Sequence, residues 1–122
     1  MMQKLYFESA WDKTIAPSDR EKIGKTFQEQ ALHLEDGIHF TFLWKAKNHK
    51  GELLIAVLIH NCEETTLHIQ DAIVTYLERD EKIATSLFSV PCEIAGKTTM
   101  PWTFIFSESN QISQAAQYVI QN

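Results

Sequence analysis

Cysteine and glycine are both scarce in this chain of 122 residues, and each scarcity excludes a class of site. Cys62 and Cys92 are the two cysteines, and they form no CxxC pair. We therefore expect free thiols in a reducing compartment rather than a disulfide. The four glycines are all isolated, so they cannot form a glycine-rich phosphate loop.

Clustered positive charge and long apolar runs are also missing. The formal net charge is −5, and no Lys/Arg cluster offsets it. Nucleic-acid binding and docking on anionic lipid are therefore disfavoured. The longest apolar run, residues 53–59, is too short for a spanning helix, so no membrane insertion is expected. No basic segment followed by an apolar stretch opens the chain, which predicts a cytoplasmic location.

The length suits one domain, and 44% apolar residues are enough to bury a core without metals or disulfides. Near the N-terminus, Ser18 and Glu21 have the spacing of a capping box. The residues that follow predict an amphipathic helix over about residues 19–33. Its apolar face consists of Ile23, Phe27, Ala31 and Leu34.

After the predicted helix, apolar residues recur at every second position, the spacing of a β-strand. Residues 38–46 alternate, with Phe42 and Trp44 expected on one face of a half-buried strand. Residues 48–51 supply turn chemistry. Residues 52–60 form a second strand that is nearly apolar on both faces, so it should lie centrally in a sheet and be covered on both sides. Together these segments predict a β-hairpin.

Further short strands are predicted at residues 4–8, in two patches within residues 66–77, and at residues 83–90. The strongest runs from Trp102 to Phe106, with Pro101 at its start or edge. Three aromatics share one face of this strand, and we expect the hairpin and the helix begun at Ser18 to cover them. The pattern predicts a mainly β protein, a β-sandwich with one short N-terminal helix. A weak apolar stripe suggests a C-terminal helix, through Ile112, Ala115, Ala116, Val119 and Ile120.

Histidine and cysteine raise a metal hypothesis, because thiolate and neutral imidazole are the usual zinc ligands. The first residues to test are His60, Cys62 and His68, with His33, His39 and His49 also present. Their spacing matches no structural zinc pattern, so satisfied or solvated histidines are the default interpretation. No known signature of a nucleophilic cysteine surrounds Cys62. We assign no catalytic, cofactor-binding or metal-ligating residue.

Charged and aromatic residues are explained by structure before function. The carboxylates are expected in solvated turns: Glu63, Glu64, Asp71, Glu78, Asp80 and Glu81. Capping and a local or cross-strand ion pair account for Asp19 and Arg20, with a partner contact as the alternative. Core packing is favoured for Trp11, Trp44 and Trp102, with exposed recognition aromatics as the alternative.

Five stretches in order resemble the SLAP domain family, which is found in duplicate in the S-layer assembly protein linked to accessory Sec export in Gram-positive bacteria. The first stretch is the aromatic N-terminal strand followed by Trp11 and residues 14–20. The other four are residues 37–38, 46–54, 58–61 and 100–104. The resemblance covers about residues 4–106. It implies an immunoglobulin-like sandwich without enzymatic activity or cofactor, which acts in secretion or envelope assembly from inside the cell. One copy is present here, and residues 107–122 extend past the family's usual last strand.

These observations predict a SLAP-like domain at residues 1–106 and a tail at residues 107–122, for which the apolar stripe suggests a helix. The expected function is a non-enzymatic adaptor that contacts another protein, or a second copy of itself, through an exposed sheet edge or the tail. The alternative is a small-molecule or metal-binding β-sandwich that uses the interior between its sheets. A purely structural role within a larger assembly is the third possibility.

Overall fold

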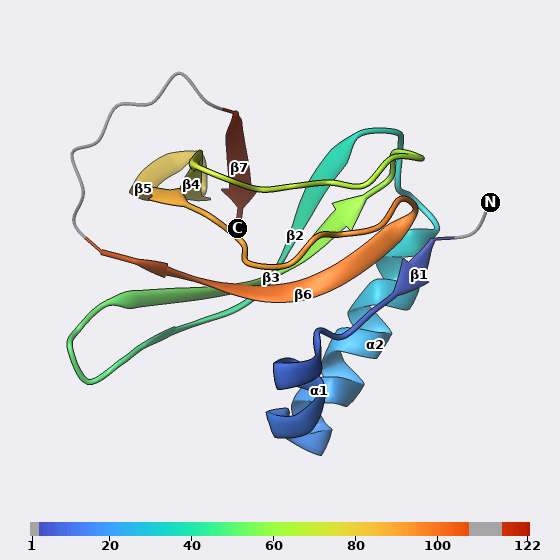
Figure 1. Cartoon of the computed structure of the whole chain (residues 1–122). Coiled ribbons are helices and arrows are strands. Elements are labelled where there is room, and N and C mark those ends of the chain that lie inside the picture. Colours follow the sequence, from blue (N-terminus) through green and yellow to red (C-terminus); the bar gives the residue numbers. More distant parts are fainter. Residues whose placement is uncertain (1–2, 108–115) are drawn as a thin grey trace.

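The computed structural model describes residues 3–107 and 116–122. Two helices and two β-sheets form its layers (Figure 1). The elements are β1 (Lys4–Leu5), α1 (Ser9–Thr14), α2 (Pro17–Ala31), β2 (Ile38–Lys47), β3 (Leu53–Asn61), β4 (Ala72–Glu78), β5 (Glu81–Phe88), β6 (Thr98–Phe106) and β7 (Gln117–Gln121).

The N-terminal segment holds two helices where one was predicted. Helix α2 begins at Pro17, and Ala16 is its N-cap without a side-chain hydrogen bond, so the predicted Ser18 capping box is wrong. Proline suits the first helical position because its missing N–H would have no partner there. The additional helix α1 is capped by Glu8, whose carboxylate accepts from the Ala10 N–H at 3.0 Å. It ends at an extended Ile15, two residues before Pro17.

The first sheet has the strand order β1-β6-β3-β2 and contains the predicted hairpin. Strands β2 and β3 pair antiparallel, and β3 also pairs antiparallel with β6. The turn is closed by Asn48, whose side-chain oxygen accepts from the N–H groups of Lys50 and Glu52 at 3.0 Å. Gly51 supplies the positive φ of 79° that this turn needs. Strand β3 is central and buried on both faces, as predicted.

The second sheet has the order β5-β4-β7. Strands β4 and β5 form a hairpin whose two loop residues, Arg79 and Asp80, both have positive φ, the signature of a type I′ turn. Strand β7 pairs parallel with β4, so the predicted C-terminal helix is wrong over Gln117–Gln121. Ile120 is fully buried while Val119 is 55% exposed, an alternation typical of a strand. Ala116 of the expected stripe is in no helix, and Ile112 and Ala115 lie outside the described residues.

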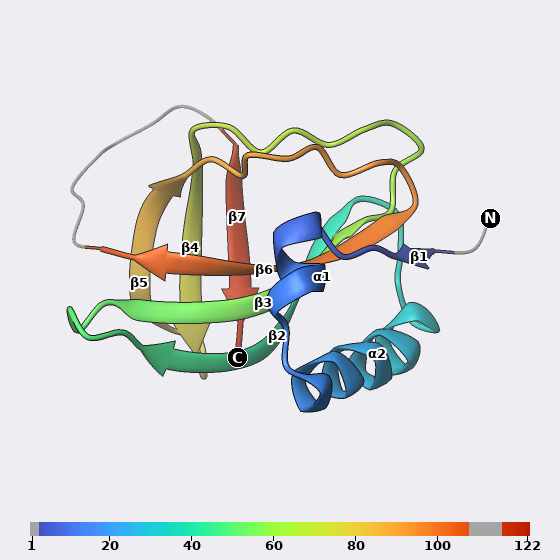
Figure 2. The same cartoon turned by 60° about the horizontal axis from the view of Figure 1, so that its bottom comes forward.

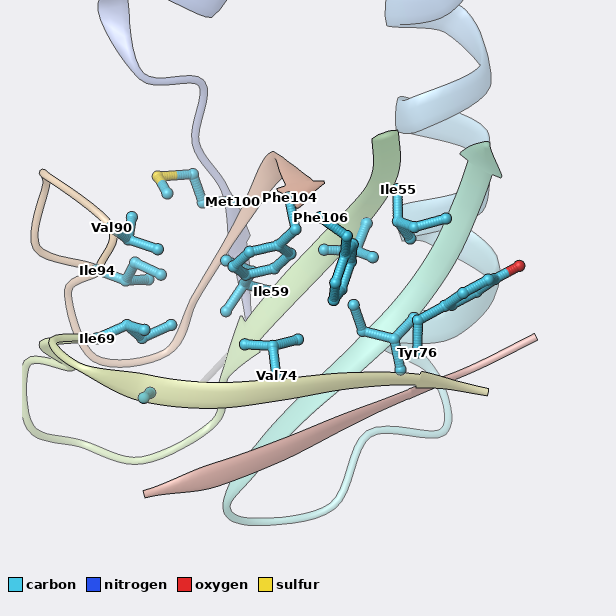
Figure 3. Packing of buried hydrophobic residues seen from close by; sticks show 13 residues of the cluster. Ile55, Ile59, Ile69, Val74, Tyr76, Val90, Ile94, Met100, Phe104 and Phe106 are labelled. Carbon is cyan, nitrogen blue, oxygen red and sulfur yellow. The ribbon is translucent and has the colours of Figure 1, made fainter. Parts of the chain in front are cut away.

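The two sheets pack face to face, and the strands of the second run across those of the first (Figure 2). The core between them contains side chains from both sheets and from the segments that connect them (Figure 3). The Phe88 ring meets the rings of Phe104 and Phe106 edge-on, with centroids 4.9 and 5.0 Å apart. The aromatic face of β6 is therefore covered by the second sheet.

The predicted cover for that face was wrong, because the helices lie on the opposite side of the first sheet (Figure 2). Ile23 of α2 packs there against Leu43, Ala56 and Leu58. The hairpin is a neighbour of β6 within one sheet and does not cover it. The protein is thus mainly β with two packed sheets, as expected, and the immunoglobulin-like arrangement itself stays a prediction.

Two glycines offer a matched test of this packing. A Cβ at Gly96 would overlap backbone atoms of Glu64, whereas a Cβ at Gly24 in α2 would meet nothing within 4 Å. We expect Gly96→Ala to lower the free energy of unfolding by about 1–3 kcal/mol. We expect Gly24→Ala to raise it by about 0.5–1 kcal/mol, because alanine favours the helix. Urea denaturation of both variants measures this, and equal effects would contradict the close approach at Gly96.

Candidate functional site: a buried polar cluster, two grooves and a strand edge

His60, the first residue of the metal hypothesis, is fully buried in a polar cluster. Its Nε2 lies 2.7 Å from the Thr41 hydroxyl, and its Nδ1 lies 2.7 Å from the Thr99 hydroxyl. Gln3 extends the cluster by donating to Thr99 Oγ1 at 3.2 Å. Both ring nitrogens of His60 are therefore engaged, and no ring nitrogen remains for a metal. Burial, with a smaller contribution from nearby His39, lowers the pKa of His60 to about 4.

The structure does not bring His60, Cys62 and His68 together as a metal site. Among the described residues, no group of three or more His, Cys, Asp and Glu side chains is placed to hold a metal ion. Cys62 is a buried free thiol whose pKa is raised by burial. His68 is exposed, with Nδ1 3.7 Å from Glu93 Oε1. Thr99 and His60 are close enough for a nucleophile and a base, but both are fully buried from substrate.

Asn61 is a buried residue whose role the sequence did not reveal. Its Nδ2 donates to the carbonyl groups of Thr65, Ile94 and Ala95 at 2.9–3.1 Å. Its Oδ1 accepts from the Glu63 N–H at 3.1 Å. Asn61 thus fastens two connecting segments to the end of β3. A single Asn after an apolar strand gives no signal by which this role could have been found.

Of the carboxylates expected in solvated turns, Glu78 is built into the structure. It accepts from Lys45 Nζ at 2.6 Å and from the Tyr76 hydroxyl at 2.5 Å, and these bonds lower its pKa. Burial raises the pKa of Tyr76 to about 12. The Lys45–Glu78 pair lies at one end of the sandwich, beside a groove of about 950 Å³. The groove is lined by Lys45, Ala46, Lys47, Gly51, Leu53, Glu78, Ile83, Ala84, Thr85, Phe106 and Ser107.

The three tryptophans divide between the two faces of the first sheet. Trp102 packs against the core between the sheets, as expected. Trp44 was predicted on the same face as Phe42, but a register shift between these residues places it on the helix side. A bulge has this effect because one extra residue reverses the alternation. Trp11 of α1 also packs on the helix side.

Trp11 and Trp44 line a second groove, of about 450 Å³, which we call the tryptophan groove. It is lined by Ala10, Trp11, Thr14, Ile15, Ala16, Asp19 and Trp44. Lys22 Nζ lies 5.4 Å from the ring centroid of Trp44. Arg20 forms the expected local ion pair, with Asp12 at 2.9 Å, and its guanidinium lies 4.6 Å from the Phe7 ring centroid.

The outer edge of β6 is open over most of its length. Strand β1 pairs with β6 at Thr98 and Thr99 alone, and the Tyr6 N–H donates to Thr99 O on that side. Backbone groups of alternate residues point to the same side of a strand, so Pro101, Thr103 and Ile105 also direct theirs away from β3. Within the described part of the chain, no strand pairs with β6 there. Pro101 therefore loses no ladder hydrogen bond.

A pH-dependent stability follows from the burial of His60. Its pKa is about 4 in the folded chain and 6.5 as its ordinary value. Between these values the unfolded chain binds a proton that the folded chain excludes, so stability falls as the pH drops from 6.5 to 4. The loss is about 3 kcal/mol. We expect His60→Gln, which cannot titrate, to remove this part of the pH dependence in urea denaturation.

The control is His49→Gln, because His49 is exposed in the turn after β2. It should leave the pH dependence of stability as in the unmodified chain. The same slope in the His60→Gln protein and in the unmodified protein would contradict a neutral buried imidazole.

Comparison with known proteins identifies the family to which the chain belongs. Among the described residues, no helix is both long and apolar enough to cross a membrane. A search of curated proteins and a search of solved structures each returned no match. The family model for the SLAP domain matches residues 5–119, from β1 into β7. Because this match covers nearly the whole chain, the protein belongs to the SLAP domain family.

Proposed function

We propose that this domain is a non-enzymatic protein-binding module that receives an extended segment of another protein along the outer edge of β6. The open backbone groups of Thr103 and Ile105 carry this proposal, because an unpaired edge can hydrogen-bond to an added strand. The exposed side chain of Ile105, at 47%, offers apolar area beside that edge. Membership of the SLAP domain family supports a role in S-layer protein export or assembly, exerted from the cytoplasm.

Two other edge strands, β2 and β7, are less suited to a partner strand. Strand β2 carries the bulge near Trp44 and charged Lys45 and Lys47 at its end, devices that discourage added strands. Strand β7 lies against β2, where Tyr118 stacks on Phe40 with centroids 5.4 Å apart. The β6 edge has neither protection.

A matched pair of lysine substitutions tests the location. Ile105→Lys puts a charge beside the β6 edge, and Val119→Lys puts one on β7 at a site of similar exposure, 55%. We expect Ile105→Lys to reduce partner capture about tenfold or more, since edge charges oppose strand addition. Val119→Lys should have little effect. Site-specific photo-crosslinking in the source cells, with a probe at residue 103, followed by identification of the attached protein, gives the measurement.

A backbone substitution separates strand addition from side-chain contact. Thr103→Pro removes one outward N–H and no bond of the β3–β6 ladder, because Pro101 already occupies an equivalent position. With the probe then at residue 105, strand addition predicts reduced crosslinking at an unchanged melting temperature. Strand addition at the β6 edge would be contradicted if crosslinking survived Thr103→Pro. It would also be contradicted if crosslinking were equally strong from a probe at residue 119. Attachment to a second copy alone, with a dimer in sedimentation, would replace the adaptor by self-association.

A further inference from the structure

We propose that the tryptophan groove binds the cationic side chain of a Lys or Arg in a partner protein. This inference rests on the protein-binding function proposed above and adds the chemistry of what is bound. The groove lies between α1, the first turn of α2, and Trp44 of β2.

The walls of the groove suit the stem and the head of such a side chain. Two indole rings from separate elements, Trp11 and Trp44, both half-buried, contribute to it. Ala10, Ile15 and Ala16 supply apolar surface for methylene groups. An indole face attracts a cation through its quadrupole, and more strongly where water is partly excluded. A volume of about 450 Å³ accommodates a long side chain.

Asp19 gives the tryptophan groove a negative charge. Its carboxylate is half-buried and makes no ion pair or side-chain hydrogen bond with the described residues. Asp12 and Glu78, by contrast, are paired with Arg20 and Lys45. An unpaired carboxylate beside two indoles complements a cation and repels an acidic or phosphorylated side chain.

The nearby cations are consistent with this choice. Arg20 is engaged by Asp12 and by the Phe7 ring. Lys22 is exposed, and its ammonium lies over the Trp44 ring. The ring therefore already accepts a cation from within the chain, and Lys22 competes with the partner for it.

Capped tripeptides provide the test, in the full chain labelled with ¹⁵N. The probes are acetyl-Gly-Lys-Gly-amide and its neutral match, acetyl-Gly-Gln-Gly-amide. The indole N–H signals of Trp11 and Trp44 should shift with the lysine peptide and not with the glutamine peptide. Trp102 faces the core between the sheets and serves as an internal control.

Three variants sharpen the result. Asp19→Asn should weaken lysine-peptide binding about fivefold, the loss expected for one partly exposed ion pair. Asp12→Asn is the matched control and should change binding less than twofold, since Asp12 does not line the groove. Lys22→Met should strengthen binding about twofold by removing the competitor. A backbone spectrum like that of the unmodified chain establishes folding for each.

Several outcomes would overturn the proposal. Equal shifts with the glutamine peptide would show that the groove does not select a cationic side chain over a neutral one. Equal losses in the Asp19 and Asp12 variants would reduce the effect to general surface charge. Absence of shifts at millimolar peptide would also refute it. Crosslinking from the β6 edge is independent of these results, so failure of the groove and failure of the protein-binding function are distinguishable.

Discussion

Strand β3 imposes the constraint on which the rest of the structure depends. It is buried on both faces, with Ile55, Val57 and Ile59 on one side and Ala56 and Leu58 on the other. Burial of each isoleucine, valine or leucine side chain contributes about 1.5–3 kcal/mol, so neither face can be left in water. One face is covered by the second sheet and the other by α1 and α2. Three layers are therefore the arrangement that this one strand requires.

A three-layer arrangement around a central strand leaves the sheet edges as the places where backbone groups remain open. Two residues of β1 pair with β6, and Pro101 occurs where β6 has no neighbour. Buried polar groups elsewhere are satisfied internally, as His60 and Asn61 show. Among the described residues, every buried side-chain nitrogen or oxygen has a hydrogen-bond partner. The described part of the interior therefore has no unpartnered polar side chain that could bind a ligand. For this reason the proposed binding sites are on the surface.

The sequence was sufficient to predict elements whose apolar residues recur with a regular local spacing. The hairpin of β2 and β3 was predicted because alternation, turn residues and a doubly apolar strand agree there. The start of α2 was misplaced because Ser18 and Glu21 fit a capping box, while Pro17 suits the first helical position equally well. Tail residues Val119 and Ile120 fit both a helix and a strand, and pairing with β4 decided between them. Local pattern does not contain that pairing.

The candidate site was harder to predict because it depends on contacts between distant segments. Alternation assigned Trp44 to the face of Phe42, and a bulge of one residue moved it toward Trp11 and Asp19. A satisfied or solvated histidine was the default for His60, and a metal ligand stayed the alternative, because a sequence does not show its two threonine partners. Only the assembled fold distinguishes an engaged histidine from an available one.

The strand register relates the two proposed surfaces to each other. Trp44 pairs with Ala56, and Ile105 pairs with Leu54, two residues along β3 from Ala56 and on the same face. Neighbouring strands are about 4.8 Å apart, so β2 and β6 are about 10 Å apart across β3. Ile105 and the tryptophan groove therefore open on the same side of the first sheet. A segment added to β6 would lie one strand further out, about 14 Å from β2 and farther than one lysine side chain extends, so a partner that uses both surfaces needs residues beyond the added strand to reach the groove.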